Sequence, residues 1–127
     1  MKYLIVGHGG LAAGTKKTVE FLVGEREDVL TLDIGPENAG VQDQLRAIVE
    51  DCTADGLMVF TDTPKCEAHQ YCLELKREKN FQLVSGYNVA LLLEALLAEE
   101  LSEDEIGELV DEMKGQLVYV NDLLGRE

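Results

Sequence analysis

The alternation of short apolar runs with longer stretches of helical periodicity most limits the folds open to this sequence. Continuous apolar runs of strand length occur at residues 3–6, 29–32, 57–60 and 81–84. Such runs are typical of parallel strands that are covered on both faces. Between the runs, apolar residues recur every three or four positions, which predicts helices near 11–22, 41–52 and 68–75.

Strands that alternate with helices through short links imply right-handed crossovers and helices on both faces of the sheet. We therefore predict an α/β fold with an open, mostly parallel, doubly wound sheet, and we take 2-1-3-4 as its strand order, in which the first and third strands are neighbours. The length of 127 residues suits one core, and no linker or internal repeat interrupts the sequence. Residues 1–127 are expected to form a single domain.

The last third of the sequence has a different pattern. The stretch NVALLLEALLAEEL is apolar almost all round, which is typical of a helix that lies under other elements or in a subunit interface. Ser102 and Glu105 have the spacing of a capping box, and Gly115 is suited to end the helix that they begin. The final apolar run, QLVYV, could form a fifth, antiparallel strand.

Composition excludes several classes of function. The formal net charge of −14 repels phosphate backbones and anionic lipid head groups, so we expect neither nucleic-acid binding nor membrane association. A partner with a basic docking face would be attracted instead. No apolar stretch approaches the ~18 residues needed to span a bilayer, and the N-terminus does not resemble a signal peptide. A cytoplasmic location is predicted.

The three cysteines do not suggest a disulfide framework, because their number is odd. Cys52 falls on the apolar stripe of a predicted helix and is expected in the core. Cys66, His69 and Cys72 are residue types that bind zinc, but their spacing spreads them over about a third of a helix circumference and no fourth ligand is evident. We expect no metal site there, with Cys72 in the core.

Two polar residues that follow strands are the candidate catalytic pair. His8 ends the first predicted strand and Asp62 ends the third. In the order 2-1-3-4 these strands are neighbours, and sites in such sheets form at the carboxyl ends of strands. A carboxylate that binds one imidazole nitrogen leaves the other nitrogen neutral and nucleophilic. His8 is therefore a candidate acceptor of a phosphoryl group, although a histidine at a strand end can equally be structural.

Backbone amides next to the histidine could bind an anion. Gly9, Gly10 and Leu11 begin a predicted helix, where free N–H groups and the helix dipole favour a phosphate-like group. The sequence GHGG lacks the G-x-G-x-x-G spacing of a dinucleotide-binding loop. A cofactor of that kind is not expected.

In order along the chain, four segments resemble the mannose-family IIA component of the bacterial phosphoenolpyruvate-dependent sugar phosphotransferase system. They are IVGHGGLAAGTKKTVEFLVGEREDV, TLDIGPENAG, VFTDT and SGYNVALLLEALL. The first is similar to the family's opening strand, active histidine and first helix, and VFTDT is similar to the strand that bears the aspartate partner. The likeness covers roughly the first hundred residues.

The resemblance implies that His8 accepts a phosphoryl group from the phosphocarrier HPr and passes it to a IIB domain. Asp62 would hold the imidazole, and Gly9, Gly10 and Thr63 would lie near the phosphoryl group. The family fold is an open α/β sheet, often a homodimer with an exchanged C-terminal strand, and it holds no cofactor. QLVYV is placed to be that strand.

One loop departs from the family pattern D-T-x-G-G-S-P, because this chain reads DTPKCEAHQYC. Pro64 removes a backbone donor and fixes φ, and Glu67 adds a negative charge. Lys65 could offset both changes by pairing with phosphoryl oxygens, or it could be a solvated loop residue. The loop therefore indicates altered partner specificity or reduced transfer activity.

Other functions stay open from the sequence. The remodelled loop motivates a regulatory or scaffold domain of the same fold with weakened or no transfer activity. A variant of the family serves dihydroxyacetone kinases, and sequence chemistry does not separate that pathway from sugar transport. A receiver domain with Asp62 as phosphoryl acceptor is disfavoured, because the first strand ends in Gly-His rather than in an acidic pair.

Overall fold

The computed structural model describes residues 1–36 and 40–125. The chain divides into two compact units, Met1–Val89 and Ala90–Glu127, which are described separately. Residues 37–39, within the segment TLDIGPENAG, lie outside the described residues.

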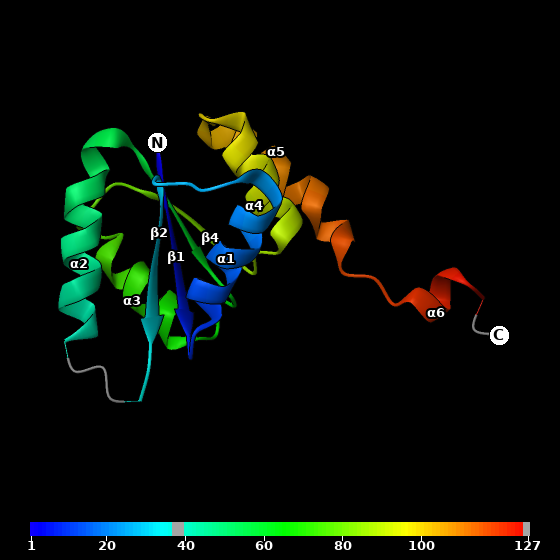
Figure 1. Cartoon of the computed structure of the whole chain (residues 1–127), viewed down its shortest axis with the longest axis horizontal. Helices are drawn as coiled ribbons and strands as arrows, with labels where there is room; N and C mark the ends of the chain where they lie inside the picture. The colour runs from blue at the N-terminus through cyan, green and yellow to red at the C-terminus, as the bar shows by residue number, and fades with distance from the viewer. Residues whose placement is uncertain (37–39, 126–127) are drawn as a thin grey trace. The chain divides into compact units, whose positions relative to one another are not determined.

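The first unit is a four-stranded sheet with helices in the connections (Figure 1). All three strand pairs are parallel and the order is β2-β1-β3-β4, which confirms the predicted fold class and order. In chain order the elements are β1 Lys2–His8, α1 Leu11–Val23, β2 Val29–Ile34, α2 Val41–Cys52, η1 Thr53–Asp55, β3 Leu57–Thr61, α3 Glu67–Leu75 and β4 Gln82–Ser85.

Helices cover both faces of this sheet, as the apolar strands require. Figure 1 shows α2 and α3 on one side of the sheet and α1 on the other. Leu4 and Val6 of β1 belong to the buried cluster that includes α2 and α3. Tyr3 and Ile5 of β1 are also buried. Because successive side chains of a strand point to opposite faces, these two lie on the other face of the sheet. Burial on both faces accounts for the continuous apolar runs.

The second unit is helical in the part that the structure describes. Its elements are α4 Val89–Ala98, whose first residue belongs to the first unit, α5 Glu103–Met113, η2 Lys114–Gln116 and α6 Val120–Leu123. Ser102 and Glu105 form the predicted capping box, with each side chain bound to the other's backbone N–H. Within 1–36 and 40–125, no helix is both long and apolar enough to cross a membrane.

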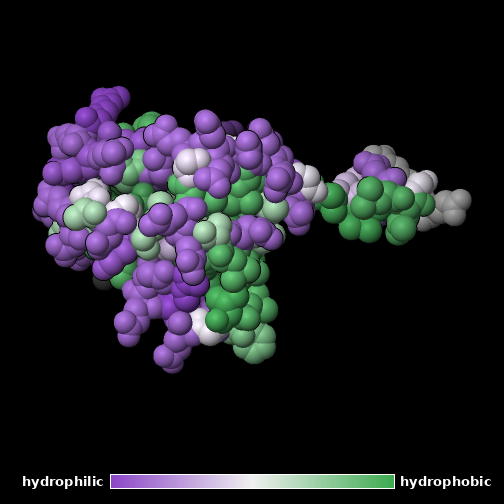
Figure 2. Space-filling model, turned by 90° about the horizontal axis from the view of Figure 1, so that it is seen from above, coloured by the Kyte–Doolittle hydropathy of each residue, from purple (hydrophilic) through white to green (hydrophobic). Residues whose placement is uncertain are grey.

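The expected fifth strand at QLVYV is not formed by the described residues, so this prediction is wrong for the single chain. Gln116 ends η2, residues 117–119 belong to no regular element, and Val120 begins α6. The physical reason is that a strand needs a neighbour for its backbone hydrogen bonds, and none of the four described strands pairs with this segment. Leu117 is 95% exposed, and the apolar side chains near it are also exposed (Figure 2).

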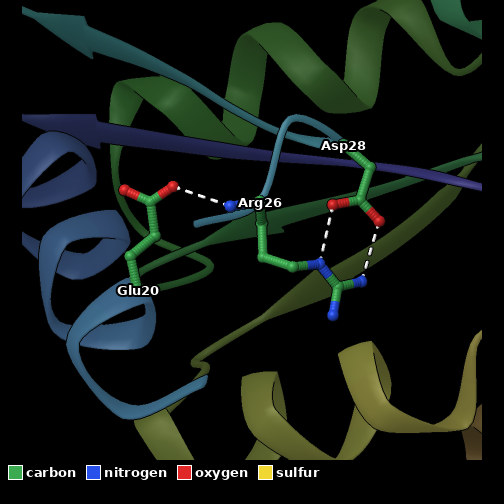
Figure 3. A network of polar contacts seen from close by, with 3 residues as sticks. All are labelled: Glu20, Arg26 and Asp28. Carbon is green, nitrogen blue, oxygen red and sulfur yellow. Dashed lines mark hydrogen bonds and ion pairs between the residues drawn. The ribbon is translucent and has the colours of Figure 1, made fainter. Parts of the chain in front are cut away.

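An ion pair fixes the link between α1 and β2. Arg26 donates from Nε and Nη2 to the two carboxylate oxygens of Asp28, at 2.9 and 2.8 Å, and its backbone N–H donates to Glu20 (Figure 3). The backbone carbonyl of Asp28 accepts a hydrogen bond from Tyr3 N–H of β1. These contacts set the position at which β2 begins beside β1.

The Asp28 pair predicts a pH-dependent contribution to stability. Its hydrogen bond with Arg26 lowers the pKa of the Asp28 carboxyl below its ordinary value of 3.8, although burial opposes the shift. The contribution is complete above the unfolded pKa and is lost as pH falls through the lower folded pKa. Asp28→Asn should cost up to about 1 kcal/mol at neutral pH. Urea unfolding should show this difference shrinking as pH falls through 3.8 and below, and a difference at low pH equal to that at neutral pH would contradict the assignment.

Two glycines near the start of α1 give a matched pair of variants. A Cβ at Gly7 would lie 2.9 Å from the Ala12 nitrogen and 3.1 Å from Asp33 Oδ1, whereas a Cβ at Gly14 meets nothing within 4 Å. Gly7→Ala should destabilise the fold by about 1–3 kcal/mol through overpacking. Gly14→Ala should stabilise it by up to about 1 kcal/mol, because alanine favours the helix. Thermal and urea unfolding measure both, and equal effects of the two variants would refute the close approach at Gly7.

Candidate functional site at the carboxyl edge of the sheet

The candidate catalytic residues lie at one edge of the sheet. His8 is the last residue of β1, and Asp62 follows Thr61, the last residue of β3. The two strands are neighbours, with Val6 paired to Thr61. His8 is half-buried and Asp62 is exposed. Both residues therefore lie at the open edge where ligands bind in parallel sheets.

No hydrogen bond joins the two side chains in the described part of the chain. Among the residues that the structure describes, neither the His8 ring nor the Asp62 carboxylate makes a hydrogen bond or an ion pair. Along β1, His8 is in phase with Val6, whereas Asp62 is in phase with Phe60 on β3, and alternate residues face opposite sides of a sheet. The pairing of His8 with Asp62 stays a prediction.

The turn after His8 has an open backbone. Gly9 and Gly10 have φ of 61° and 96°, a left-handed conformation that glycine adopts without a steric penalty. The Gly9 N–H donates to the Ile34 carbonyl at 3.1 Å, so this amide is already engaged. The amides of Gly10 and Leu11 make no hydrogen bond within the described part of the chain. Of the three predicted anion-binding amides, these two are open to a ligand.

The side chain of Asp33, a residue of β2, caps the first turn of α1. Sequence reasoning missed this residue. Its carboxylate accepts hydrogen bonds from the Ala12 and Ala13 amides at 2.9 and 3.0 Å. A carboxylate is stabilised there by free N–H groups and the helix dipole. Asp33 pairs with Gly7 across the β1–β2 ladder. The order 2-1-3-4 was the available signal, because it brings the end of the second strand to the edge that carries His8.

Tyr87 lies on the α1 side of this edge and was also missed. Its hydroxyl is 3.0 Å from Thr15 Oγ1, and its ring meets Phe60 edge-on at 6.4 Å. Burial raises the pKa of the Tyr87 phenol, and the negative charges of Asp62 and Asp33 raise it further, while the Thr15 hydrogen bond opposes both. The two carboxylates thus act on the same phenol. Tyr87 lies two residues after Ser85, the last residue of β4, which pairs with Thr61 of β3 at this edge.

The loop after Asp62 turns back on itself. The Thr63 carbonyl accepts hydrogen bonds from the Cys66 N–H and Sγ, and Thr63 Oγ1 lies 3.4 Å from the Lys65 nitrogen. The Lys65 side chain is exposed. Cys66 Sγ also accepts the His69 N–H as the N-cap of α3. The Lys65 and Cys66 amides are therefore engaged inside this loop, and Pro64 has no N–H to offer a ligand.

Cys66, His69 and Cys72, the three residues of zinc-binding type, do not form a metal-binding group in the described part of the chain. Across residues 1–36 and 40–125, no group of three metal-binding side chains comes together. His69 Nδ1 lies 3.4 Å from the Thr61 hydroxyl, which in turn donates to Ser85 Oγ at 2.8 Å. Cys52 and Cys72 are buried, which confirms the two cysteine core positions predicted from the sequence.

Solved structures of phosphotransferase proteins have the same fold. The IIA protein of the fucose utilization operon from Streptococcus pneumoniae has a TM-score of 0.85 at 23% identity, over 97% of this chain and 95% of that one. The mannose/sorbose-specific IIA subunit from Enterococcus faecalis has a TM-score of 0.83 at 21% identity, over 93% and 92%. Component EIIA from Streptococcus agalactiae has a TM-score of 0.79 at 22% identity, over 95% and 98%.

The family follows from the sequence match. The model of the EIIA-man family, described as PTS system fructose IIA component, matches residues 2–114, and the chain belongs to this family. The predicted resemblance to mannose-family IIA components is thereby confirmed. The comparison with curated proteins gave no match.

The cysteine environments predict selective alkylation. Burial raises the pKa of the Cys72 thiol to about 12, with a further contribution from Cys66, and burial also raises the pKa of Cys52. Because the thiolate is the nucleophile, iodoacetamide near pH 8 should label half-buried Cys66 first. Cys52 and Cys72 should react only in denaturant, and Cys66→Ser should remove the fast phase. Fast labelling of Cys72 in the folded protein would contradict its described burial.

Proposed function

We propose that this chain is a phosphoryl carrier, in which His8 accepts a phosphoryl group from HPr and passes it to a IIB domain. The observation that carries the proposal is the position of His8. In a IIA-family chain it ends the central strand β1, is half-buried at an open edge, and precedes two left-handed glycines. The amides of Gly10 and Leu11 beside it have no partner among the described residues.

The proposed chemistry uses few groups. A neutral His8 nitrogen attacks phosphorus, and the bond to the donor breaks with its electron pair going to the donor. The Gly10 and Leu11 amides would hydrogen-bond the phosphoryl oxygens, while Asp62 turns to hold the second imidazole nitrogen. The exposed Lys65 would add a positive charge. Gly9 and Thr63 would lie next to the group, although the Gly9 N–H is already bound to the Ile34 carbonyl and Thr63 Oγ1 already accepts the Lys65 N–H. No cofactor is required.

We also propose the setting in which the carrier acts. Transfer between HPr and IIB implies a cytoplasmic location, and the net charge of −14 favours partners with basic docking faces. The family match over 2–114 supports a single IIA domain spanning 1–127. A homodimer is supported by the exposed apolar side chains near the C-terminus, which a second copy could cover.

The alternative is a regulatory or scaffold domain with weak or no transfer. The observation in its favour is the 62–66 loop, whose donors bind within the loop. Such a domain would bind its partner equally well with and without the imidazole, and a change of His8 would not affect its function. The pathway served, sugar transport or dihydroxyacetone phosphorylation, does not alter the proposed step.

The chain contains two histidines, so two variants are enough to identify the phosphoryl acceptor. Phosphoenolpyruvate, the first enzyme of the system and HPr should add one acid-labile phosphoryl group to the wild-type chain. His8→Ala should abolish the label, because the acceptor nitrogen is lost. His69→Ala is the matched control and should retain the label, because His69 lies on α3 against Thr61.

Mass spectrometry and phosphohistidine stability at acid and alkaline pH measure the outcome. An unlabelled wild type with an active donor set would contradict the carrier function. Capture of a IIB or other partner with equal affinity by wild type and His8→Ala would then favour the scaffold.

A further inference from the structure

Asp33 ties the end of β2 to the start of α1. Each of its carboxylate oxygens accepts one first-turn amide, Oδ1 from Ala12 at 2.9 Å and Oδ2 from Ala13 at 3.0 Å. With both oxygens engaged, α1 cannot turn or slide relative to β2 without losing a charge-assisted hydrogen bond. The position of the helix start is therefore determined by a side chain from a different strand.

The Asp33 carboxylate lies close to the backbone of Gly7, the residue that precedes His8. Gly7 pairs with Asp33 between β1 and β2, and a Cβ on Gly7 would lie 3.1 Å from Asp33 Oδ1. On the other side of His8, the Gly9 N–H donates to the Ile34 carbonyl at 3.1 Å. The residues on both sides of the histidine are thus held by the last two residues of β2.

We propose that Asp33 is a positioning residue for His8, which fixes the Gly9–Gly10 turn so that the imidazole meets the incoming phosphoryl group in a productive orientation. This inference rests on the proposed function. Asp33 does not touch the transferred group. By binding the Ala12 and Ala13 amides it also leaves the Gly10 and Leu11 amides as the free donors at this turn.

The role differs from that of a helix cap that only adds stability. A cap of that kind changes the fraction of folded molecules but not the speed at which each folded molecule accepts the phosphoryl group. A positioning residue changes that speed, because small displacements of reacting groups strongly slow a transfer. It changes the affinity for the donor protein less, since the donor contacts a wider surface than one turn.

The experiment measures transfer from phosphorylated HPr over a range of donor concentrations, with unfolding of each variant measured in parallel. Asp33→Ala should lower the maximal transfer rate about tenfold or more, with KM for phosphorylated HPr changed less than about twofold. Asp33→Asn should lie between wild type and Asp33→Ala, because its carbonyl oxygen accepts one amide while its NH₂ opposes the other. Asp28→Asn is the matched control at the opposite end of β2, and it should lose stability but keep the wild-type rate.

Three outcomes would overturn the inference while the proposed function stands: an unchanged maximal rate in Asp33→Ala, a rise in KM alone, or an equal slowing in Asp28→Asn. If Asp33→Ala does not fold, Asp33→Asn is judged by the same criteria. A wild-type chain that takes no phosphoryl group overturns the proposed function, and the inference with it.

Discussion

The pairing of β1 with both β2 and β3 is the constraint on which the rest of the first unit depends. Because β1 is central and parallel to both neighbours, the residues that end all three strands lie at one edge. The apolar faces of β1 are covered by helices on both sides, which leaves only its ends for polar chemistry. His8 occupies the carboxyl end of that strand, with β2 and β3 supplying its flanks.

The electrostatics of this edge are set by carboxylates as much as by the imidazole. Asp33 neutralises part of the helix start, and together with Asp62 it raises the pKa of the Tyr87 phenol. Under the proposed function, a phosphoryl group on His8 would add negative charge to an edge that already carries the Asp33 and Asp62 carboxylates. Repulsion between these charges would favour release of the group, as the proposed carrier role requires.

Sequence reasoning predicted the elements whose burial leaves an apolar pattern in the sequence. It failed for the elements and side chains whose structure depends on a contact with a distant part of the chain. The four apolar runs identified the strands, because burial on both faces leaves an apolar signal along each run, and the order 2-1-3-4 taken for them is the one observed. QLVYV has the composition of a strand, but strand formation needs a pairing edge that no local pattern contains. Asp33 was missed because its partners, Ala12 and Ala13, are backbone amides about twenty residues away. Sequence brought His8 and Asp62 to one edge, but strand alternation, which the sequence analysis did not apply to these two residues, places them in opposite phase.

The exposed apolar side chains of residues 117–124 have a consequence for how the stability of this protein is measured. Water-exposed leucine, valine and tyrosine side chains gain free energy when any surface covers them. Where a second copy provides that surface, folding becomes linked to association by mass action. The melting temperature then rises with protein concentration, so a value obtained from a dilute sample describes the isolated chain and underestimates the resistance of the assembled form.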